Sequence, residues 1–289
     1  MTRLQDLIEL TRLPAALTVP GDALAGAAAA GTLRSWRPAV LAASSACFYW
    51  AGMALNDYAD RDLDARERPE RPIPSGRVSP PTALRLSGGL TLAGLALAAA
   101  TGRRPLAVAL SLAGAVWTYD LVAKPTIAGP LVMGTTRFLD VLMGGSAHPR
   151  RALPAALALG VHTTAVTVLS RGEVHGTSNR TAAAALATTG AVAATGAVQS
   201  LRDTSAPLAA RVSGAAFASL YAFAVGRAQG AAVAQPDAAT VRRATRRGIH
   251  GMVPLQASLI ARRGQLGIAA GLLALVPVLR AAAKVVSPT

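Results

Sequence analysis

The sequence is poor in several residue types, and each scarcity narrows the class of protein. Its 289 residues include one cysteine, Cys47, which excludes an internal disulfide and a metal site built from several cysteines. Aromatic residues make up 4% of the chain and charged residues 15%, whereas about a quarter of a soluble domain is usually charged. Hydrophobic residues make up 52%, and the mean hydropathy is +0.40. This composition is typical of an integral membrane protein.

Apolar runs recur along the whole chain, and most are close to the length of about 20 residues that crosses a bilayer as a helix. We therefore predict one all-α domain over residues 1–289, with nine transmembrane helices. These helices are expected at residues 14–34, 38–55, 83–101, 105–122, 126–145, 152–169, 181–200, 208–226 and 264–283.

The net charge of +15 sets the expected orientation. In a soluble protein such an excess would indicate nucleic acid. Here the arginines stand between apolar runs and do not alternate with aromatic residues, so we interpret them as topological charge and expect no nucleic-acid partner. More basic residues fall on the side of the N terminus, which predicts a multi-pass protein of a bacterial cell membrane with a cytoplasmic N terminus.

Three long polar connections are predicted on this same cytoplasmic side, at residues 56–82, 170–180 and 227–263. The last is expected to contain a short helix lying along the membrane interface. The opposite connections are short. We therefore expect the functional site at the cytoplasmic face.

The stretch LNDYADRDLDARERPERPIPSGRVS, residues 55–79, holds six of the 14 acidic residues of the chain. If the preceding helix continues, Asp57, Asp60 and Asp64 stand at i, i+3 and i+7. They then fall within about 60° of arc, with Asn56 at its border. Like charges on one helical face repel, so a cation is expected to hold them together.

Carboxylate and amide oxygens are hard ligands that suit Mg²⁺, and protein-bound Mg²⁺ often recruits the phosphates of a substrate. The arginines that follow, Arg71 among them, match phosphate oxygens in geometry. The alternative interpretation is a solvated loop whose charges pair with one another and with lipid headgroups.

The pattern NDxxDxxxD at residues 56–64, followed by RPIPSGR at residues 71–77, resembles the first Asp-rich motif of the UbiA superfamily of intramembrane prenyltransferases. The resemblance implies a helical bundle around a central cavity open to the cytoplasmic side. It also implies Mg²⁺-dependent binding of a prenyl diphosphate and transfer of the prenyl group to an aromatic or lipid acceptor. Asp57, Asp60 and Asp64 would then bind the metal.

A second Asp-rich motif is usual in this superfamily in the loop after the sixth helix, where this chain reads LSRGEVHGTSNRT. The segment SRGEVHG resembles the EboC-like subgroup. The resemblance implies Glu173 as a further metal ligand, and Arg171 and His175 as diphosphate contacts. Because Glu173 is a single carboxylate, the alternative is a non-catalytic protein that binds, presents or transports a prenylated lipid or precursor.

The segment WTYDLVAKP brings Tyr119, Asp120 and Lys124 to the end of a predicted helix. Asp120 and Lys124 stand at i and i+4, so they either pair across one turn or face the site. The resemblance implies that this segment lies at the mouth of the cavity, with Lys124 contacting the diphosphate.

Ionisable residues inside predicted spans are expected to be functional or mutually paired. Arg137 and Asp140 either form a buried pair or face the cavity, with Arg137 toward an anionic group and Asp140 orienting it. Asp22 is either a site residue or the partner of Arg137 or Arg12. His162 is interpreted as a hydrogen-bonded packing residue.

Overall fold

The computed structural model describes residues 3–12 and 19–286, and every regular element in these ranges is helical. The elements are α1 (Leu4–Thr11), α2 (Pro20–Ala30), α3 (Arg37–Ala59), α4 (Arg61–Glu67), α5 (Pro80–Thr101), α6 (Arg103–Thr118), the π-helical turn η2 (Tyr119–Ala123), α7 (Gly129–Gly144), α8 (Pro149–Ser170), α9 (Asn179–Arg202), α10 (Leu208–Ala234), α11 (Ala238–Ala261) and α12 (Leu266–Val286).

The helix ends follow from local sequence. Proline stands in the first turn of α2, α5, α7 and α8, where its missing N–H costs no intrahelical hydrogen bond. Ser79 and Ser178 cap α5 and α9, because each hydroxyl accepts a hydrogen bond from the backbone amide three residues on. Gly31 ends α2 in the left-handed region, with φ of 74°, which glycine adopts without a Cβ penalty.

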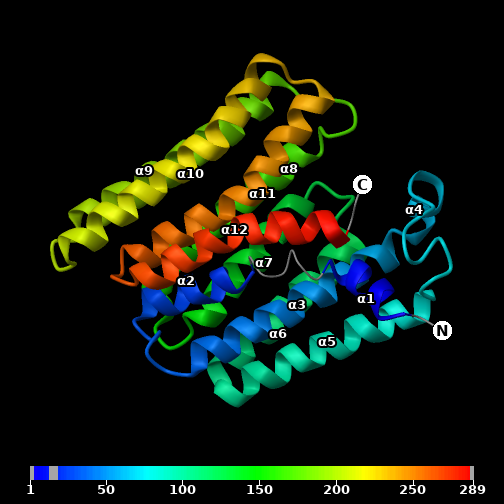
Figure 1. Cartoon of the computed structure of the whole chain (residues 1–289), viewed down its shortest axis with the longest axis horizontal. Helices are drawn as coiled ribbons and strands as arrows, with labels where there is room; N and C mark the ends of the chain where they lie inside the picture. Colours follow the sequence, from blue (N-terminus) through cyan, green and yellow to red (C-terminus); the bar gives the residue numbers. More distant parts are fainter. Residues whose placement is uncertain (1–2, 13–18, 287–289) are drawn as a thin grey trace.

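The bundle has two sides that meet at α2 and α7. Figure 1 shows α3, α5 and α6 running together on one side and α8, α9, α10 and α11 on the other. Helix α2 packs against α3, α7, α8 and α11. Small residues allow this close approach. A Cβ at Gly26 would collide with the backbone of Val141, and one at Gly144 would collide with the backbone of Ala23.

This contact predicts a strong difference between two glycines. Gly144→Ala is expected to destabilise the protein by about 1–3 kcal/mol, because the added methyl group meets backbone that cannot rotate away. Gly190→Ala on α9 is the matched control, since nothing lies within 4 Å of its Cβ position. Thermal unfolding of the two purified variants in detergent checks this, and equal midpoints would contradict the packing of α2 on α7.

Six helices of the described chain are long and apolar enough to cross a membrane, which makes this a multi-pass membrane protein. They are α3, α5, α6 with η2, α8, α9 and α10. Each coincides with a predicted span. The predicted first span, 14–34, is represented by α2 from Pro20, and residues 14–18 lie outside the described ranges.

The prediction of a cytoplasmic loop over residues 227–263 was wrong. Helix α10 continues to Ala234, and residues 238–261 form the 24-residue helix α11. Its second half is buried in the main hydrophobic core, so α11 is not a helix lying along the interface. At its start Arg242 donates to the Glu173 carbonyl at 2.6 Å, and just after its end Arg263 pairs with Asp203 at 3.6 Å.

Helix α11 therefore runs the length of the bundle (Figure 1). It places Arg262 and Arg263 at the end opposite the acidic stretch, whereas the sequence interpretation had placed them on the same side. Helix α12 then runs back beside α11. Arginines in the first half of α11 hide this helix from a hydropathy count, because the buried half alone is too short to span a bilayer.

Candidate functional site

The acidic stretch does not form one continuous helical face. Helix α3 ends at Ala59, Asp60 caps it with φ −87° and ψ 2°, and α4 starts at Arg61 in a new direction. Asp57 and Asp64 nevertheless come together, because both contact Arg71. The Arg71 Nη1 atom lies 2.6 Å from Asp64 Oδ2 and 3.6 Å from Asp57 Oδ1. Both aspartates are 4% exposed.

Each carboxylate of the motif has a cation partner from another part of the chain. Asp57 also contacts Arg12, at the end of α1, with Nη2 to Oδ1 at 3.2 Å. Asp60, which is more accessible, contacts the ammonium group of Lys124 just after η2. The predicted repulsion among the acids is thus offset by Arg12, Arg71 and Lys124. Within residues 3–12 and 19–286, no three acidic, histidine or cysteine side chains are placed to hold a metal ion.

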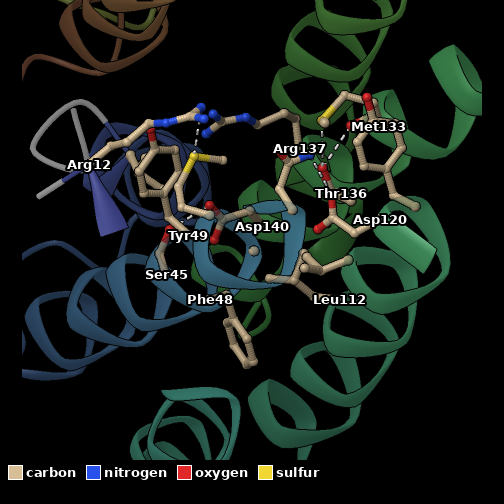
Figure 2. Close-up of a pocket in the computed structure, with 16 residues that line it drawn as sticks. Arg12, Ser45, Phe48, Tyr49, Leu112, Asp120, Met133, Thr136, Arg137 and Asp140 are labelled. Carbon is tan, nitrogen blue, oxygen red and sulfur yellow. Dashed lines mark hydrogen bonds between the residues drawn. The ribbon is translucent and has the colours of Figure 1, made fainter. Parts of the chain in front are cut away.

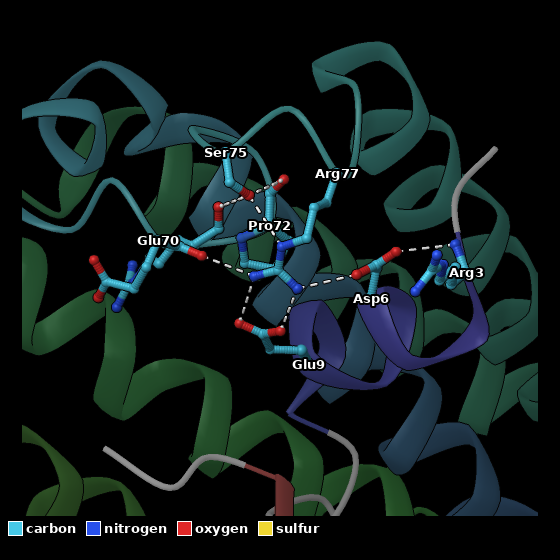
Figure 3. Close-up of polar contacts among 8 residues, drawn as sticks. Arg3, Asp6, Glu9, Glu70, Pro72, Ser75 and Arg77 are labelled. Carbon is cyan, nitrogen blue, oxygen red and sulfur yellow. Dashed lines mark hydrogen bonds and ion pairs between the residues drawn. The ribbon is translucent and has the colours of Figure 1, made fainter.

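Helix α1 is fastened to the same region by Arg77 (Figure 3). The Arg77 guanidinium lies 3.0 Å from Asp6 Oδ1, donates to both carboxylate oxygens of Glu9 at 2.7 and 3.1 Å, and donates to the Glu70 carbonyl at 2.8 Å. The hydrogen bond from the Arg3 amide and the charge of Arg77 hold the pKa of Asp6 below its usual range. This docking positions Arg12 over Asp57.

Arg77→Gln is expected to loosen α1, because the variant loses the charged fork that joins Asp6 and Glu9 to the loop. Amides of Leu4–Thr11 should exchange with deuterium at least about tenfold faster, as measured by mass spectrometry. Arg68→Gln in the same exposed loop is the control and should leave exchange unchanged, since its side chain has no partner among the described residues.

The same contact has a defined pH dependence. Because the pKa of Asp6 is lowered on folding, its contribution is present above its ordinary value of 3.8 and is lost as pH falls through the lower folded value. In the wild-type protein α1 should therefore stay docked between pH 7 and 5. The exchange rates of its amides, corrected for intrinsic exchange, should be constant over this interval. Release of α1 within that interval would contradict the assignment.

A cavity of about 200 Å³ opens beside the motif, between α3, α6, η2 and α7 (Figure 2). Its walls are largely apolar and its ends are polar. The lining residues are Arg12, Val19, Ser45, Phe48, Tyr49, Gly52, Met53, Asn56, Leu112, Val116, Tyr119, Asp120, Met133, Thr136, Arg137 and Asp140.

At the end near the motif, Asn56 Nδ2 donates to Asp120 Oδ1 at 3.1 Å. Asp120 therefore does not form an ion pair with Lys124, because Lys124 pairs with Asp60 instead. The reason is the π-helical turn over Tyr119–Ala123, which widens the backbone so that residues four apart no longer stack. Tyr119 lines the same part of the cavity, as predicted.

At the inner end, Arg137 Nη1 binds Asp22 Oδ2 at 2.8 Å. Gln256 of α11 donates to the other Asp22 oxygen at 2.6 Å. Asp140 instead accepts a hydrogen bond from Ser45 at 2.5 Å, and its Oδ1 has no partner among the described residues. Of the alternatives weighed from sequence, the pair Asp22–Arg137 is the one formed, and Arg137 and Asp140 both line the cavity.

The loop between α8 and α9 approaches the site through one residue. Arg171 donates to the Thr126 carbonyl, two residues beyond Lys124. Within the described residues, Glu173 and His175 form no hydrogen bond or ion pair with the three aspartates, and Glu173 is not gathered with them into a metal site. The predicted participation of Glu173 and His175 therefore stays a prediction.

His162 is a packing residue, as predicted. Its Nε2 donates to the Gly248 carbonyl at 3.0 Å, and its Nδ1 accepts the Tyr221 hydroxyl at 2.7 Å. The sequence interpretation missed Ser45, and it considered Arg12 only as a partner of Asp22. The visible signal for Ser45 was the pair of hydroxyls in the otherwise apolar run AASSACF.

A bundle of apolar helices with a largely apolar cavity and paired charges beside it defines a multi-pass membrane protein with a candidate ligand-binding site. The chain belongs to the UbiA prenyltransferase family, whose model matches residues 17–233.

Three relatives illustrate the likeness. The digeranylgeranylglyceryl phosphate synthase of Methanothrix thermoacetophila is 36% identical over 170 residues, which cover 57% of this chain and 62% of that protein. The apo structure of a UbiA homologue from Aeropyrum pernix K1 superposes with a TM-score of 0.69 at 18% identity, covering 85% of this chain and 96% of that chain.

The third is a UbiA homologue from Archaeoglobus fulgidus bound to DMAPP and Mg²⁺, with a TM-score of 0.60 at 14% identity, covering 86% and 99% of the two chains. At these identities the structural likeness establishes the fold. The chain spans less than two thirds of the length of the curated relative it matches.

Proposed function

We propose that this protein transfers a prenyl group from a prenyl diphosphate to a membrane-soluble acceptor, with Mg²⁺ as cofactor. One observation carries the proposal: Asp57 and Asp64 converge on Arg71 beside a largely apolar cavity, inside the segment that matches the family. The relative from Methanothrix thermoacetophila carries the name of a prenyl-transferring synthase, and the Archaeoglobus fulgidus homologue binds DMAPP and Mg²⁺.

The oxygen donors fit a magnesium ion. Asp57 and Asp64 converge on one cationic atom of Arg71, and Asp60 lies between them in sequence, so these three carboxylates would hold the ion. Carboxylate oxygens are hard ligands that suit Mg²⁺. These carboxylates already contact the positive charges of Arg12, Arg71 and Lys124. Mg²⁺ held by these carboxylates would neutralise part of the charge of the diphosphate.

The side chains of this protein then have separable roles. On substrate binding Arg71 and Lys124 turn from Asp64 and Asp60 to phosphate oxygens, and Arg171 approaches from the neighbouring loop. They stabilise the electron pair that passes to the diphosphate as the allylic C–O bond breaks. The apolar walls, including Phe48 and Val116, protect the allylic cation from water.

The inner polar end is proposed as the acceptor side. Arg137 is held by Asp22, so its remaining donors are fixed toward the cavity. The unpartnered Oδ1 of Asp140 accepts a hydrogen bond from a hydroxyl or amino group of the acceptor and takes its proton as the new bond to the prenyl carbon forms. Asn56 keeps Asp120 in place at the opposite end.

We place the acidic end, the cavity mouth and the N terminus on the cytoplasmic side. Support comes from the arginines of the acidic stretch and of the first half of α11, which gather at this end. Glu173 and His175 are proposed to approach the diphosphate from the α8–α9 loop, because Arg171 of that loop already reaches the segment beside Lys124. The nine predicted spans omit α11, which we include among the proposed spanning helices because it extends from the Glu173 end of the bundle to the Asp203 end.

The second candidate is a non-catalytic protein that binds and presents a prenylated lipid. It is favoured by the separation of Glu173 from the three aspartates. Incubating purified protein with radiolabelled geranyl diphosphate, membrane lipid extract and Mg²⁺ separates the two. Diphosphate release with formation of a labelled lipid product, both stopped by EDTA, supports the transferase, and retention of intact geranyl diphosphate supports the second candidate.

A further inference from the structure

A second charged cavity lies away from the proposed active site, between the last turns of α10 and the first half of α11. It has a volume of about 400 Å³. Its polar lining consists of Arg243, Arg246, Arg247, His250 and the hydroxyl-bearing Thr240, and two alanines of α10 close the other side. No acidic residue lines it.

The positive charge of this groove comes from three arginines. None of Arg243, Arg246 and Arg247 forms an ion pair with a carboxylate of the described chain. Asp237, the N-cap of α11, is already engaged: it accepts the Ala239 amide at 2.9 Å and the Thr240 hydroxyl at 2.7 Å. Three guanidinium groups in a groove that no acidic residue lines favour the binding of an anion.

One of these arginines is held in place from within the groove. Arg243 Nη2 donates to Thr240 Oγ1 at 2.7 Å, and Thr240 is itself buried. The chain Asp237–Thr240–Arg243 therefore fixes one guanidinium at the wall of the groove, while Arg246 and Arg247 stay exposed on the next turn. Arginine presents a planar fork that matches two phosphate oxygens at once.

Exposed apolar side chains lie on α10 and α11 on the side of the groove that faces the middle of the bundle. On α10, Leu220 and Phe223 are exposed, Phe223 to 61%, and Ile249 is exposed on α11. Helix α10 is one of the six long apolar helices, and the groove lies at its C-terminal end. A ligand bound along this surface would place its charged group in the headgroup region of the membrane and its apolar part in the hydrocarbon core.

We propose that the groove is a binding site for the phosphate of an anionic phospholipid from the leaflet on this side of the membrane. The guanidinium groups of the groove hold the lipid phosphate, and the acyl chains of the lipid lie over Leu220 and Phe223. A zwitterionic headgroup binds less well, because the three arginines repel its cationic end. The inference rests on the membrane-spanning fold and is independent of the proposed reaction.

Native mass spectrometry of the full-length protein tests this with two lipids of identical chains, dioleoyl phosphatidylglycerol and dioleoyl phosphatidylcholine. The wild type should bind phosphatidylglycerol about tenfold more tightly. The triple variant R243Q/R246Q/R247Q should lose this preference. The control R150Q/R151Q/R202Q removes the same charge from exposed positions at the other end of the bundle and should keep it.

Three results would overturn the proposal: equal binding of both lipids by the wild type, equal loss in the control, or displacement of the lipid by millimolar inorganic phosphate. The last would identify a site for a soluble anion. If the triple variant unfolds, the single variants R246Q and R247Q, whose side chains are exposed, decide: each should weaken phosphatidylglycerol binding at least about threefold, and no change would equally overturn the proposal.

Discussion

Asp60→Ala is expected to lower the rate of prenyl transfer by more than about 10²-fold, with the protein still folded. Asp60 is the most accessible of the three motif aspartates, and its one ion-pair partner among the described residues is Lys124. Removing it takes away one metal ligand and leaves Lys124 without its ground-state partner. Losses of this size are typical when one group that stabilises charge in a transition state is deleted. Release of diphosphate from a labelled prenyl diphosphate measures the effect.

Asp62→Ala is the matched control for this experiment. Asp62 belongs to the same short segment, but its side chain is 85% exposed and its only ion pair is with neighbouring Arg61 at 3.7 Å. The control should retain activity within about twofold, because surface pairs of this kind contribute little. Near-normal turnover by Asp60→Ala, or equal loss in both variants, would show that the carboxylates do not act as assigned.

Arg71→Gln is expected to change stability in a way that depends on Mg²⁺. Arg71 joins two buried carboxylates, and in the part of the chain that the structure describes Asp64 has no other ion-pair partner. Removing one member of a buried pair typically costs about 3–5 kcal/mol, because the remaining charge is left uncompensated. In EDTA the variant should therefore unfold at a clearly lower temperature than the wild type.

Millimolar Mg²⁺ should restore much of that loss, because the metal takes the place of the guanidinium between Asp57 and Asp64. The wild type should respond less, since Arg71 already neutralises the pair. Thermal unfolding with Mg²⁺, and with NaCl at equal ionic strength, separates metal binding from screening. Rescue by NaCl alone, or no rescue by either salt, would count against a metal site at these residues.

The sequence predicted a cluster of acids, but it did not predict the geometry of the cluster. From the spacing of Asp57, Asp60 and Asp64 we expected a cation between them; the structure shows cationic side chains in contact with all three, and the metal site stays a prediction. Their partners Arg12, Arg71 and Lys124 come from different elements, so only the packed fold could identify them. The break at Asp60 was also hidden, because no proline or glycine marks it.

The long helices were predictable because they are continuously apolar, and α11 was not. Its first half carries four arginines on an exposed face. Its second half is buried and packs against α2 and α8. A hydropathy count averages these two halves. The same helix supplies Gln256 to Asp22 across 234 positions of sequence, a contact that no local pattern reports.

The contact between Arg71 and Asp64 is the most direct test of the whole account. It can be measured by cryo-electron microscopy of the protein with Mg²⁺ and an unreactive thio-analogue of geranyl diphosphate. We predict that Arg71, now 2.6 Å from Asp64, moves to the phosphates while Asp57, Asp60 and Asp64 face a metal ion. Unchanged pairing of Arg71 with Asp64, with the analogue bound elsewhere or not at all, would contradict it.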